Sequence, residues 1–382
     1  MNVFLKNQVD LIFVISQIYM TFIHDQQPLV SVLIPTYQGE EFLEEALESV
    51  LSQTYHNLEI IISDDGSVDR TLEIAKNFQL QSSIKFKILT HQRLGMIPNW
   101  NFCLSMAQGK YIKFLFQDDV LTAACIKDMV ELAESDEDIG LVFSARALLI
   151  AGGVETNDTC LNFAKGIENI HLVWSKLESI QSGINLLSDP KFLDGSINKI
   201  GEPSIVLIKK NVFDTVGDFD PNLCQLVDVD MWCRIMLQYK VGFINKTLSY
   251  FRIHFSQQTV QNHEEGKITN DYQFFLQKMM ANPCYNNIPS ELKRRIYLKV
   301  EGERDDFQRQ LVNAIKRIQY LEERELELES QRKTLNSLVE EFSGKLQKAE
   351  ALIIGMESSK FWKLRMMWKN LRHRLGLPDN DS

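Results

Sequence analysis

The chain has 382 residues, of which 45% are hydrophobic and 24% charged, a balance typical of a folded protein with two or three domain-sized units. Its 41 basic and 51 acidic side chains give a net charge of -10, and a field of this sign argues against a nucleic-acid partner. The 6 cysteines form no Cys-x-x-Cys pair, so we expect buried or idle thiols in a reducing compartment.

The first segment of interest is apolar but short. Residues 11–23 (LIFVISQIYMTFI) contain Gln17, and a membrane-spanning helix needs about 20 apolar residues. We therefore expect residues 1–28 to be an N-terminal extension, with an export signal and an interfacial helix as the open alternatives.

Strand and helix patterns alternate through the next hundred residues. Short apolar runs predict strands at 30–34, 58–62, 84–89 and 111–116, and apolar residues at helical spacing predict helices at 42–51, 71–78 and 99–107. This alternation predicts an α/β fold with a mixed, largely parallel sheet and flanking helices, whose ligand sites lie at the carboxyl ends of the strands. Residues 136–265 have less regular strands and are expected to complete the same sheet.

The C-terminal third is predicted to be helical. Residues 266–301 form a helical connector, and residues 302–355 form a coiled coil that makes the protein a homo-oligomer. The apolar seam keeps a 3-4 spacing and consists of Leu311, Ala314, Ile318, Leu321, Leu328, Leu335, Val339, Phe342 and Leu346. Glu325 and Arg332 interrupt it. The alternative is a long helix folded back on its own domain.

Residues 356–382 form a basic tail. Five apolar side chains fall on one helical face, namely Phe361, Leu364, Trp368, Leu371 and Leu375. A basic helix with an aromatic stripe is typical of a helix that lies on an anionic membrane surface. The alternative is that the stripe packs on the globular domain or on a partner chain.

Carboxylates, rather than phosphate-binding loops, stand at the predicted strand ends. The sequence has no Gly-x-Gly-x-x-Gly after a strand and no Walker motif. Asp64 and Asp65 follow one strand, and Asp118 and Asp119 follow another. Adjacent acids repel one another, and a divalent cation with a preference for oxygen ligands would remove the cost of burying them. Turn chemistry is the alternative for each pair.

Seven segments in order make the sequence specific. They are VLIPTY at 32–37, SVLSQTY at 49–55, IISDDGS at 61–67, GKYIKFLFQDD at 109–119, GEPS at 201–204, DVDMWCR at 228–234 and YFRIH at 250–254. Together they resemble the family 2 glycosyltransferases. The resemblance implies a GT-A fold over residues 29–265, with a nucleotide-binding half at 29–135 and an acceptor half at 136–265.

The resemblance also implies roles for individual residues on the nucleotide side. Pro35 and Tyr37 would flank the base, and Asp65 would accept a hydrogen bond from a ring N–H such as that of uracil, which favours a UDP-sugar. Arg93 would help to neutralise phosphate.

Two further roles concern the metal and the base. Asp119, with Asp118 beside it, would place Mn²⁺ or Mg²⁺ on the diphosphate, and His254 would be a further metal ligand. Asp228 would deprotonate the acceptor.

Two departures from the family pattern bear on these roles. Gln117-Asp118-Asp119 lacks the first acid of an Asp-x-Asp motif, which leaves Asp119 as the assured metal carboxylate. Val227 stands where many relatives carry Glu, so Asp228 and Asp230 compete for the role of base. Both acids are also placed to interact with the dipole of a helix predicted over 231–239.

The sequence therefore predicts a metal-dependent, inverting glycosyltransferase that uses a nucleotide-sugar donor and a glycan or lipid-linked acceptor in surface polysaccharide synthesis. It is expected in the cytoplasm, held peripherally at the inner face of the cell membrane. The alternatives are a sugar-1-phosphate nucleotidyltransferase, and a catalytically dead GT-A domain on a coiled-coil scaffold.

Overall fold

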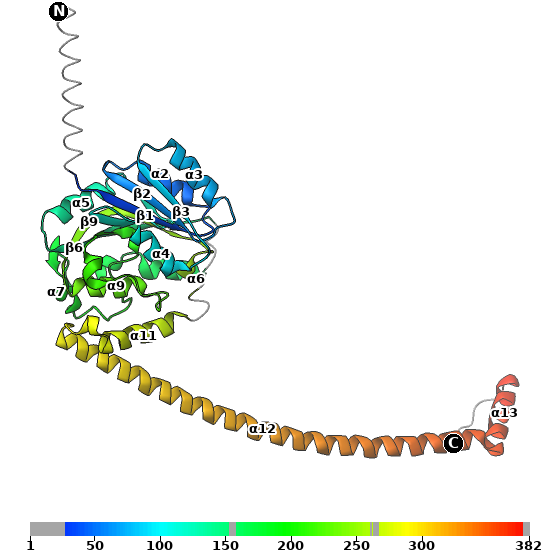
Figure 1. The fold of residues 1–382 in the computed structure, drawn as a ribbon. Helices are drawn as coiled ribbons and strands as arrows, with labels where there is room; N and C mark the ends of the chain where they lie inside the picture. The colour runs from blue at the N-terminus through cyan, green and yellow to red at the C-terminus, as the bar shows by residue number, and fades with distance from the viewer. Residues whose placement is uncertain (1–26, 153–157, 260–261, 263–266, 377–382) are drawn as a thin grey trace, which may run out of the picture. The chain divides into compact units, whose positions relative to one another are not determined.

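A computed structural model describes residues 27–152, 158–259, 262 and 267–376 (Figure 1). The predicted apolar segment at 11–23 and the last residues of the basic tail lie outside these ranges. The chain divides into two compact units, Met1–Glu301 and Gly302–Ser382. No helix within the described ranges is both long enough and apolar enough to cross a lipid bilayer.

The first unit is built on a mixed nine-stranded sheet. Its order is β3-β2-β1-β4-β8-β6-β9-β5, and β7 pairs with β9. The strands are β1 (Val30–Thr36), β2 (Leu58–Asp64), β3 (Lys85–Thr90), β4 (Tyr111–Phe114), β5 (Val120–Leu121), β6 (Ile139–Ile150), β7 (Ile180–Ser182), β8 (Val206–Lys209) and β9 (Lys240–Ile253). The strands β3, β2, β1 and β4 are parallel, as the alternating pattern predicts.

Helices cover both faces of the sheet. In this unit they are α2 (Leu43–Leu51), α3 (Thr71–Gln81), α4 (Met96–Ser105), α5 (Cys125–Glu134), α6 (Asp158–Ile167), α7 (Gly183–Leu187), α8 (Val212–Val216), α9 (Val227–Met236) and α11 (Lys267–Ala281). Helices α2 and α3 lie on one side of the sheet, and α4 and α9 on the other (Figure 1).

The core follows from the alternation of side chains along the strands. Val32 and Ile34 of β1 belong to the core layer that contains apolar residues of α2 and α5, whereas Leu33 between them belongs to the layer that contains those of α4 and α9. Because successive strand residues point to opposite faces, a run of apolar residues is required to fill both layers. This packing places the ends of β1, β2 and β4 at one edge of the sheet.

Several boundaries differ from the prediction, and two of them concern the acidic residues. The second strand extends from the predicted residue 62 to Asp64, which pairs with Thr36 of β1. The helix predicted over 231–239 begins earlier, at Val227, and ends at Met236. The carboxylate of Asp271 on α11 accepts hydrogen bonds from the backbone N–H groups of residues 224, 225 and 226, which fixes the turn before this helix. A partner so distant in sequence gives no local signal.

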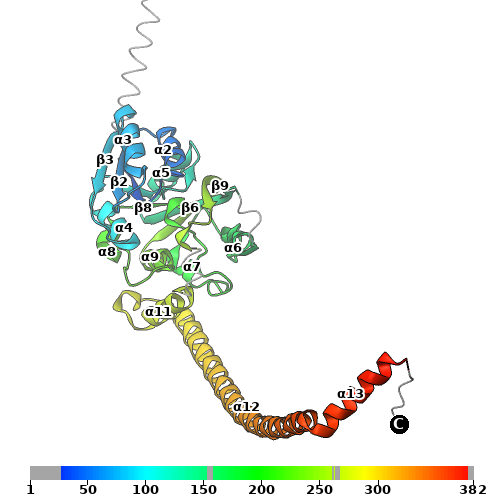
Figure 2. The ribbon, with the colours of Figure 1, turned by 90° about the vertical axis from the view of Figure 1, so that its right-hand side faces the viewer.

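A long helix, α12 (Ser290–Ser358), leaves the first unit and forms most of the second (Figure 2). Its first turns pack in the core of the first unit through Leu292 and Ile296. Helix α13 (Lys360–Arg374) follows, and the side chain of Ser359 caps it by accepting a hydrogen bond from the N–H of Trp362. The predicted fold class, a mixed sheet with flanking helices and a long C-terminal helix, is confirmed.

Candidate active site

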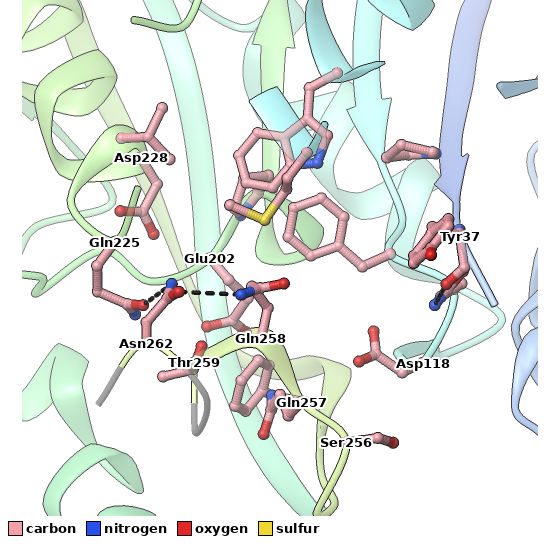
Figure 3. A pocket seen from close by; sticks show the side chains of 18 of the residues that line it. Tyr37, Asp118, Glu202, Gln225, Asp228, Ser256, Gln257, Gln258, Thr259 and Asn262 are labelled. Atoms are coloured by element: carbon pink, nitrogen blue, oxygen red, sulfur yellow. Dashed lines mark hydrogen bonds between the residues drawn. The ribbon is translucent and has the colours of Figure 1, made fainter. Parts of the chain in front are cut away.

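A pocket of about 600 Å³ opens at the edge of the sheet where β1 and β4 end (Figure 3). Its wall is formed by residues 35–39 after β1, 116–118 after β4, 201–203 before β8, 224–228 at the start of α9 and 256–259 after β9. Of the predicted site residues, the pocket brings together Pro35, Tyr37, Asp65, Arg93, Asp118, Asp228 and His254. Asp119 and Asp230 do not line it.

Tyr37 and Arg93 form a stacked pair on one side of the pocket. The guanidinium carbon of Arg93 lies 3.8 Å from the centre of the Tyr37 ring, and the guanidinium also donates to the Tyr37 hydroxyl. Gln117 holds the tyrosine backbone, since its Oε1 accepts from Tyr37 N at 2.9 Å and its Nε2 donates to Tyr37 O at 3.0 Å. A Cβ on Gly39 would lie 2.3 Å from Gln117 Oε1, so glycine leaves room for this clamp.

The carboxylate of Asp65 holds a neighbouring loop while it lines the pocket. It accepts hydrogen bonds from the backbone N–H groups of Leu94 and Gly95. Gly95 has a φ of 95°, a conformation that glycine adopts without strain. Because a carboxylate has about four lone-pair sites, Asp65 keeps the capacity to accept from a ligand as well.

Asp118 and His254 contact each other on the pocket wall. The Nε2 atom of His254 lies 2.9 Å from Oδ2 of Asp118, and its Nδ1 atom lies 2.8 Å from the hydroxyl of Ser256. The ring of Phe42 lies against the imidazole, with centroids 4.8 Å apart. The imidazole is therefore fixed on three sides, with one nitrogen directed at the acid of the pocket wall.

Asp119 lies behind this wall and is 1% exposed. Its Oδ1 accepts from the backbone N–H of Arg252 at 3.0 Å, and its Oδ2 has no hydrogen-bond partner among the described residues. Burial, and then the negative charges of Asp118 and Glu202, raise the pKa of the Asp119 carboxyl well above its ordinary value. The structure thus places Asp118, and not Asp119, where a ligand would meet it.

The residues of the pocket wall offer a divalent cation a carboxylate and an imidazole. Among the described residues, no group of three or more His, Cys, Asp or Glu side chains is arranged to hold a metal ion by itself. Mg²⁺ characteristically binds through one or two carboxylates and completes its shell with substrate phosphates and water. Asp118 and His254 therefore fit a cation that is shared with a bound diphosphate.

Asp228 projects from the first turn of α9 on the opposite side of the pocket. Its Oδ2 accepts from Nδ2 of Asn198 at 2.8 Å, and its Oδ1 accepts from the N–H of Val229 at 2.7 Å. Burial raises the pKa of the Asp228 carboxyl to about 7, and the negative charge of Glu202 adds to this increase. The hydrogen bonds from Val229 and Asn198 act in the opposite direction and lower the pKa. A carboxylate with such a pKa is suited to accept a proton near neutral pH.

Asp230 is fully buried in a network of its own. It pairs with Arg234 at 2.9 Å and with Lys278 at 2.7 Å, and it accepts from the hydroxyl of Tyr285 at 2.9 Å. These contacts join α9 to α11 and to the segment after it. The carboxylate of Asp230 thus links helices, and only Asp228 of the two candidates faces the pocket.

Sequence reasoning missed several pocket residues. Glu202 belongs to the Gly-Glu-Pro-Ser segment, but nothing in the sequence pairs it with Arg146. In the structure, Nε of Arg146 lies 2.9 Å from the carboxylate of Glu202. The amides of Asn198, Gln225 and Asn262 also line the pocket. Single amides in loops carry no spacing signal, so only the folded chain could identify them.

Comparison with known proteins finds similarity to glycosyltransferases. Residues 31–157 match the family described as Glycosyl transferase family 2. The chain is 27% identical over 233 residues to an uncharacterized glycosyltransferase of Rickettsia typhi. The aligned region covers 61% of this chain and 66% of that protein. A Rickettsia felis glycosyltransferase is 28% identical over 244 residues, 62% of this chain and 36% of its own length. An uncharacterized Mycobacterium tuberculosis protein is 29% identical over 266 residues. The aligned region covers 69% of this chain and 80% of that protein.

Solved structures show the same fold at low sequence identity. TarS of S. aureus, residues 1-349 in complex with UDP-GlcNAc, superposes with a TM-score of 0.52 at 15% identity, over 71% of each chain. A second structure of TarS 1-349 superposes with a TM-score of 0.51 at 16% identity, over 73% of this chain and 72% of that one. The fold of the first unit is accordingly the GT-A type.

Proposed function

We propose that this chain, a glycosyltransferase similar to family 2 over residues 31–157, transfers a sugar from a nucleotide donor to a hydroxyl of a glycan or lipid-linked acceptor, with inversion at the anomeric carbon. The observation that carries this proposal is the position of Asp228, a carboxyl with a pKa of about 7 that faces the pocket opposite Asp118 and His254.

The nucleotide binds on the side of Tyr37 and Arg93. Pro35 and the Tyr37 ring contact the base, and Arg93 supplies positive charge for the diphosphate. Asp65 accepts a hydrogen bond from a ring N–H, which favours a UDP-sugar. The binding of UDP-GlcNAc by the structurally similar TarS supports a donor of this class.

Asp118 and His254 would hold the cation, Mn²⁺ or Mg²⁺. When bound, it supplies positive charge that stabilises the departing diphosphate. This assignment exchanges the parts predicted for Asp118 and Asp119, because only the former lies on the pocket wall. Asp119 accepts a hydrogen bond from the backbone of Arg252 in β9, the strand that ends just before His254.

Asp228 acts as general base. Its carboxylate takes the proton of the acceptor hydroxyl, the hydroxyl oxygen forms a bond to the anomeric carbon, and the bond from that carbon to the diphosphate oxygen breaks on the opposite face. Asn198 keeps the carboxylate in place by donating to Oδ2. Asp230 has no part in this step, because its oxygens are engaged by Arg234, Lys278 and Tyr285.

The activity is tested with the full-length protein and a panel of nucleotide-sugars with Mn²⁺, by measuring the release of nucleoside diphosphate. Release from a UDP-sugar, abolished by EDTA and restored by Mn²⁺, is the expected result. The NMR coupling constant of the anomeric proton in the product then reports the stereochemistry. Retention of configuration would contradict the base mechanism, and full activity in EDTA would contradict the metal.

We also propose that the second unit assembles the enzyme at a membrane where surface polysaccharide is made, on its cytoplasmic side. In the described part of α12, the predicted seam side chains are exposed, including Leu311, Leu328 and Phe342 at 50%, 51% and 64%. An exposed apolar seam of this length is stabilised by a second copy in a coiled coil. Sedimentation of the full chain as a monomer at micromolar concentration would contradict the assembly.

Helix α13 supports the membrane part of this proposal. Its apolar stripe is exposed, with Phe361 at 84% and Trp368 at 60%, beside lysines and arginines. Each basic residue near anionic lipid contributes about 1 kcal/mol of binding. Binding to anionic vesicles should fall with salt and disappear on deletion of residues 358–382. Equal binding by the truncated protein would place the membrane contact elsewhere.

A further inference from the structure

Uncharged polar side chains gather on the pocket wall near Asp228 (Figure 3). They come from three segments that are far apart in sequence, namely Ser196, Asn198, Gln225, Gln258, Thr259 and Asn262. Hydroxyls and primary amides of this kind both donate and accept hydrogen bonds, as the hydroxyl groups of a sugar do. The mechanism above uses only Asn198 of this group.

Three of these amides form a directed chain of hydrogen bonds. Nε2 of Gln258 donates to Oδ1 of Asn262 at 3.0 Å, and Nδ2 of Asn262 donates to Oε1 of Gln225 at 3.0 Å. These are the dashed lines of Figure 3. Asn262, at the centre of the chain, is 2% exposed. Within the described residues, Oε1 of Gln258 and Nε2 of Gln225 make no hydrogen bond, so one acceptor and one donor remain for a ligand.

The three hydrogen-bonded amides are fixed beside the proposed base, Asp228. The backbone N–H of Gln225 donates to the carboxylate of Asp271 at 2.7 Å, and α9, which carries Asp228, begins just after this turn. Side chains that are held before a ligand arrives lose little conformational entropy when they bind it. The two ends of the chain are therefore positioned to orient a molecule whose hydroxyl reaches Asp228.

The charges of the pocket disfavour an anionic molecule at this position. Among the described residues that line the pocket, the positively charged or chargeable side chains are Arg93, Arg146 and His254. Arg93 stacks on Tyr37, Arg146 pairs with Glu202, and His254 contacts Asp118. Since Arg93 lies on the side assigned to the donor diphosphate and Arg146 is paired, a phosphate beside Gln225 would face the carboxylates of Glu202 and Asp228.

We propose that Gln225, Asn262 and Gln258 form the acceptor subsite, and that the acceptor presents an uncharged sugar, rather than a phosphate-bearing unit, to Asp228. A sugar with neighbouring hydroxyls accepts from Nε2 of Gln225 and donates to Oε1 of Gln258, whereas a phosphate group at neutral pH is predominantly an acceptor. This inference rests on the proposed function, because it names the acceptor of the same reaction.

The test uses the full-length protein, the donor identified by diphosphate release, and two sets of acceptors. One set contains neutral methyl and octyl glycosides of hexoses and N-acetylhexosamines, and the other contains hexose phosphates and glycerol phosphate oligomers. Transfer to the neutral set is expected. Gln225→Leu and Gln258→Leu should each raise the acceptor KM about tenfold, as expected for the loss of one hydrogen bond of about 1.4 kcal/mol.

The controls separate the subsite from the enzyme as a whole. Gln238→Leu removes an exposed amide just beyond the end of α9, outside the pocket, and should leave every constant unchanged. The KM for the donor and the slow donor hydrolysis without acceptor should be unchanged in the Gln225 and Gln258 variants. Gln225→Lys should weaken the use of neutral acceptors and improve that of phosphorylated ones.

Several outcomes would overturn the subsite. One is that the unaltered protein prefers the phosphorylated acceptors. Another is that the acceptor KM is unchanged in both Gln225→Leu and Gln258→Leu. If neither set supports turnover, saturation-transfer NMR with the neutral glycosides decides: binding that is lost in Gln225→Leu supports the subsite, and no binding overturns it. Failure of the proposed function is distinct, because no donor would then release nucleoside diphosphate at all.

Discussion

The acids that follow β4 and those that begin α9 make an informative comparison. Each region contains one aspartate that lines the pocket and one that is buried behind it: Asp118 with Asp119, and Asp228 with Asp230. The buried members differ in their partners. Asp230 is compensated by Arg234 and Lys278, whereas Asp119 has a backbone N–H on one oxygen and no hydrogen bond on the other within the described residues.

This difference shows that burial alone does not tell what an acid does. A buried carboxylate with two cations stabilises the fold through its partners, and its removal leaves them uncompensated. A buried carboxylate without a cation tends to be protonated, as the raised pKa of Asp119 indicates. The acids on the pocket wall are free for chemistry because their other contacts leave one side toward the ligand.

The largest expected effect is on stability, at Asp230. Asp230→Ala removes the carboxylate that pairs with Arg234 and one of the two that pair with Lys278, which keeps Asp220, so the free energy of unfolding should fall by about 3 kcal/mol. Chemical denaturation measures it. The control, Glu291→Ala, breaks an exposed pair with Arg294 and should change stability by less than about 1 kcal/mol. Equal effects would contradict the distinction between the two kinds of acid.

The next effect is on turnover, at Asp228. Asp228→Asn should reduce kcat by a factor on the order of 10² or more, because the amide cannot take the proton of the acceptor hydroxyl. Donor binding, followed by thermal shift, should hardly change. If donor affinity falls together with the rate, Asp228 belongs to the nucleotide or metal site and not to the base.

The two acids after β4 should differ in metal dependence. Asp118→Asn should abolish transfer and the stabilisation of the protein by UDP with Mn²⁺, because it removes the carboxylate of the pocket wall. Asp119→Asn should retain most of that stabilisation. In the unaltered protein Oδ1 of Asp119 accepts a hydrogen bond from the backbone N–H of Arg252, and the amide oxygen of asparagine can accept the same bond. Thermal shift in the presence and absence of Mn²⁺ distinguishes them. The reverse ranking would restore the sequence-based prediction for Asp119.

The smallest expected effect is on pH dependence. Since the pKa of Asp228 is raised to about 7, its base form is lost below this pH, and kcat/KM should rise with pH up to about 7 and then level off. Glu202→Gln removes a negative charge that contributes to the increase, so the rise should move to lower pH. A profile with no inflection between pH 5.5 and 8.5 would argue against Asp228 as the base.

The same pKa has a consequence for stability. An acid whose pKa is higher in the folded state than in the unfolded state lowers the free energy of unfolding as the pH rises from about 4 to about 7. Asp228→Asn removes this loss and should make the protein more stable than the unaltered chain at pH 8. Denaturation of both proteins at pH 5 and pH 8 measures the difference, and an equal change at both values would contradict it.

The sequence by itself determined the sheet that supports the site. Runs such as 30–34 and 58–62 are mostly apolar and are separated by segments with helical spacing. These patterns are local, so β1 to β4 and the helices between them were predictable within a few residues, whereas β5 to β9 had no predicted bounds. The motif order also identified Asp65, Asp118, Asp228 and His254 as candidates, all of which line one pocket. The start of α9 was not predictable, because Asp271 fixes it from another helix.

Only the tertiary structure decided which member of each acidic pair faces the pocket. Asp118 and Asp119, like Asp228 and Asp230, have similar local sequence environments, and their difference arises from groups that the fold brings from elsewhere: Arg252 and Lys278 among them. The pairing of Arg146 with Glu202 and the amide chain through Asn262 have the same origin. Burial and charge depend on three-dimensional neighbours, and these neighbours are set by the packing of distant segments.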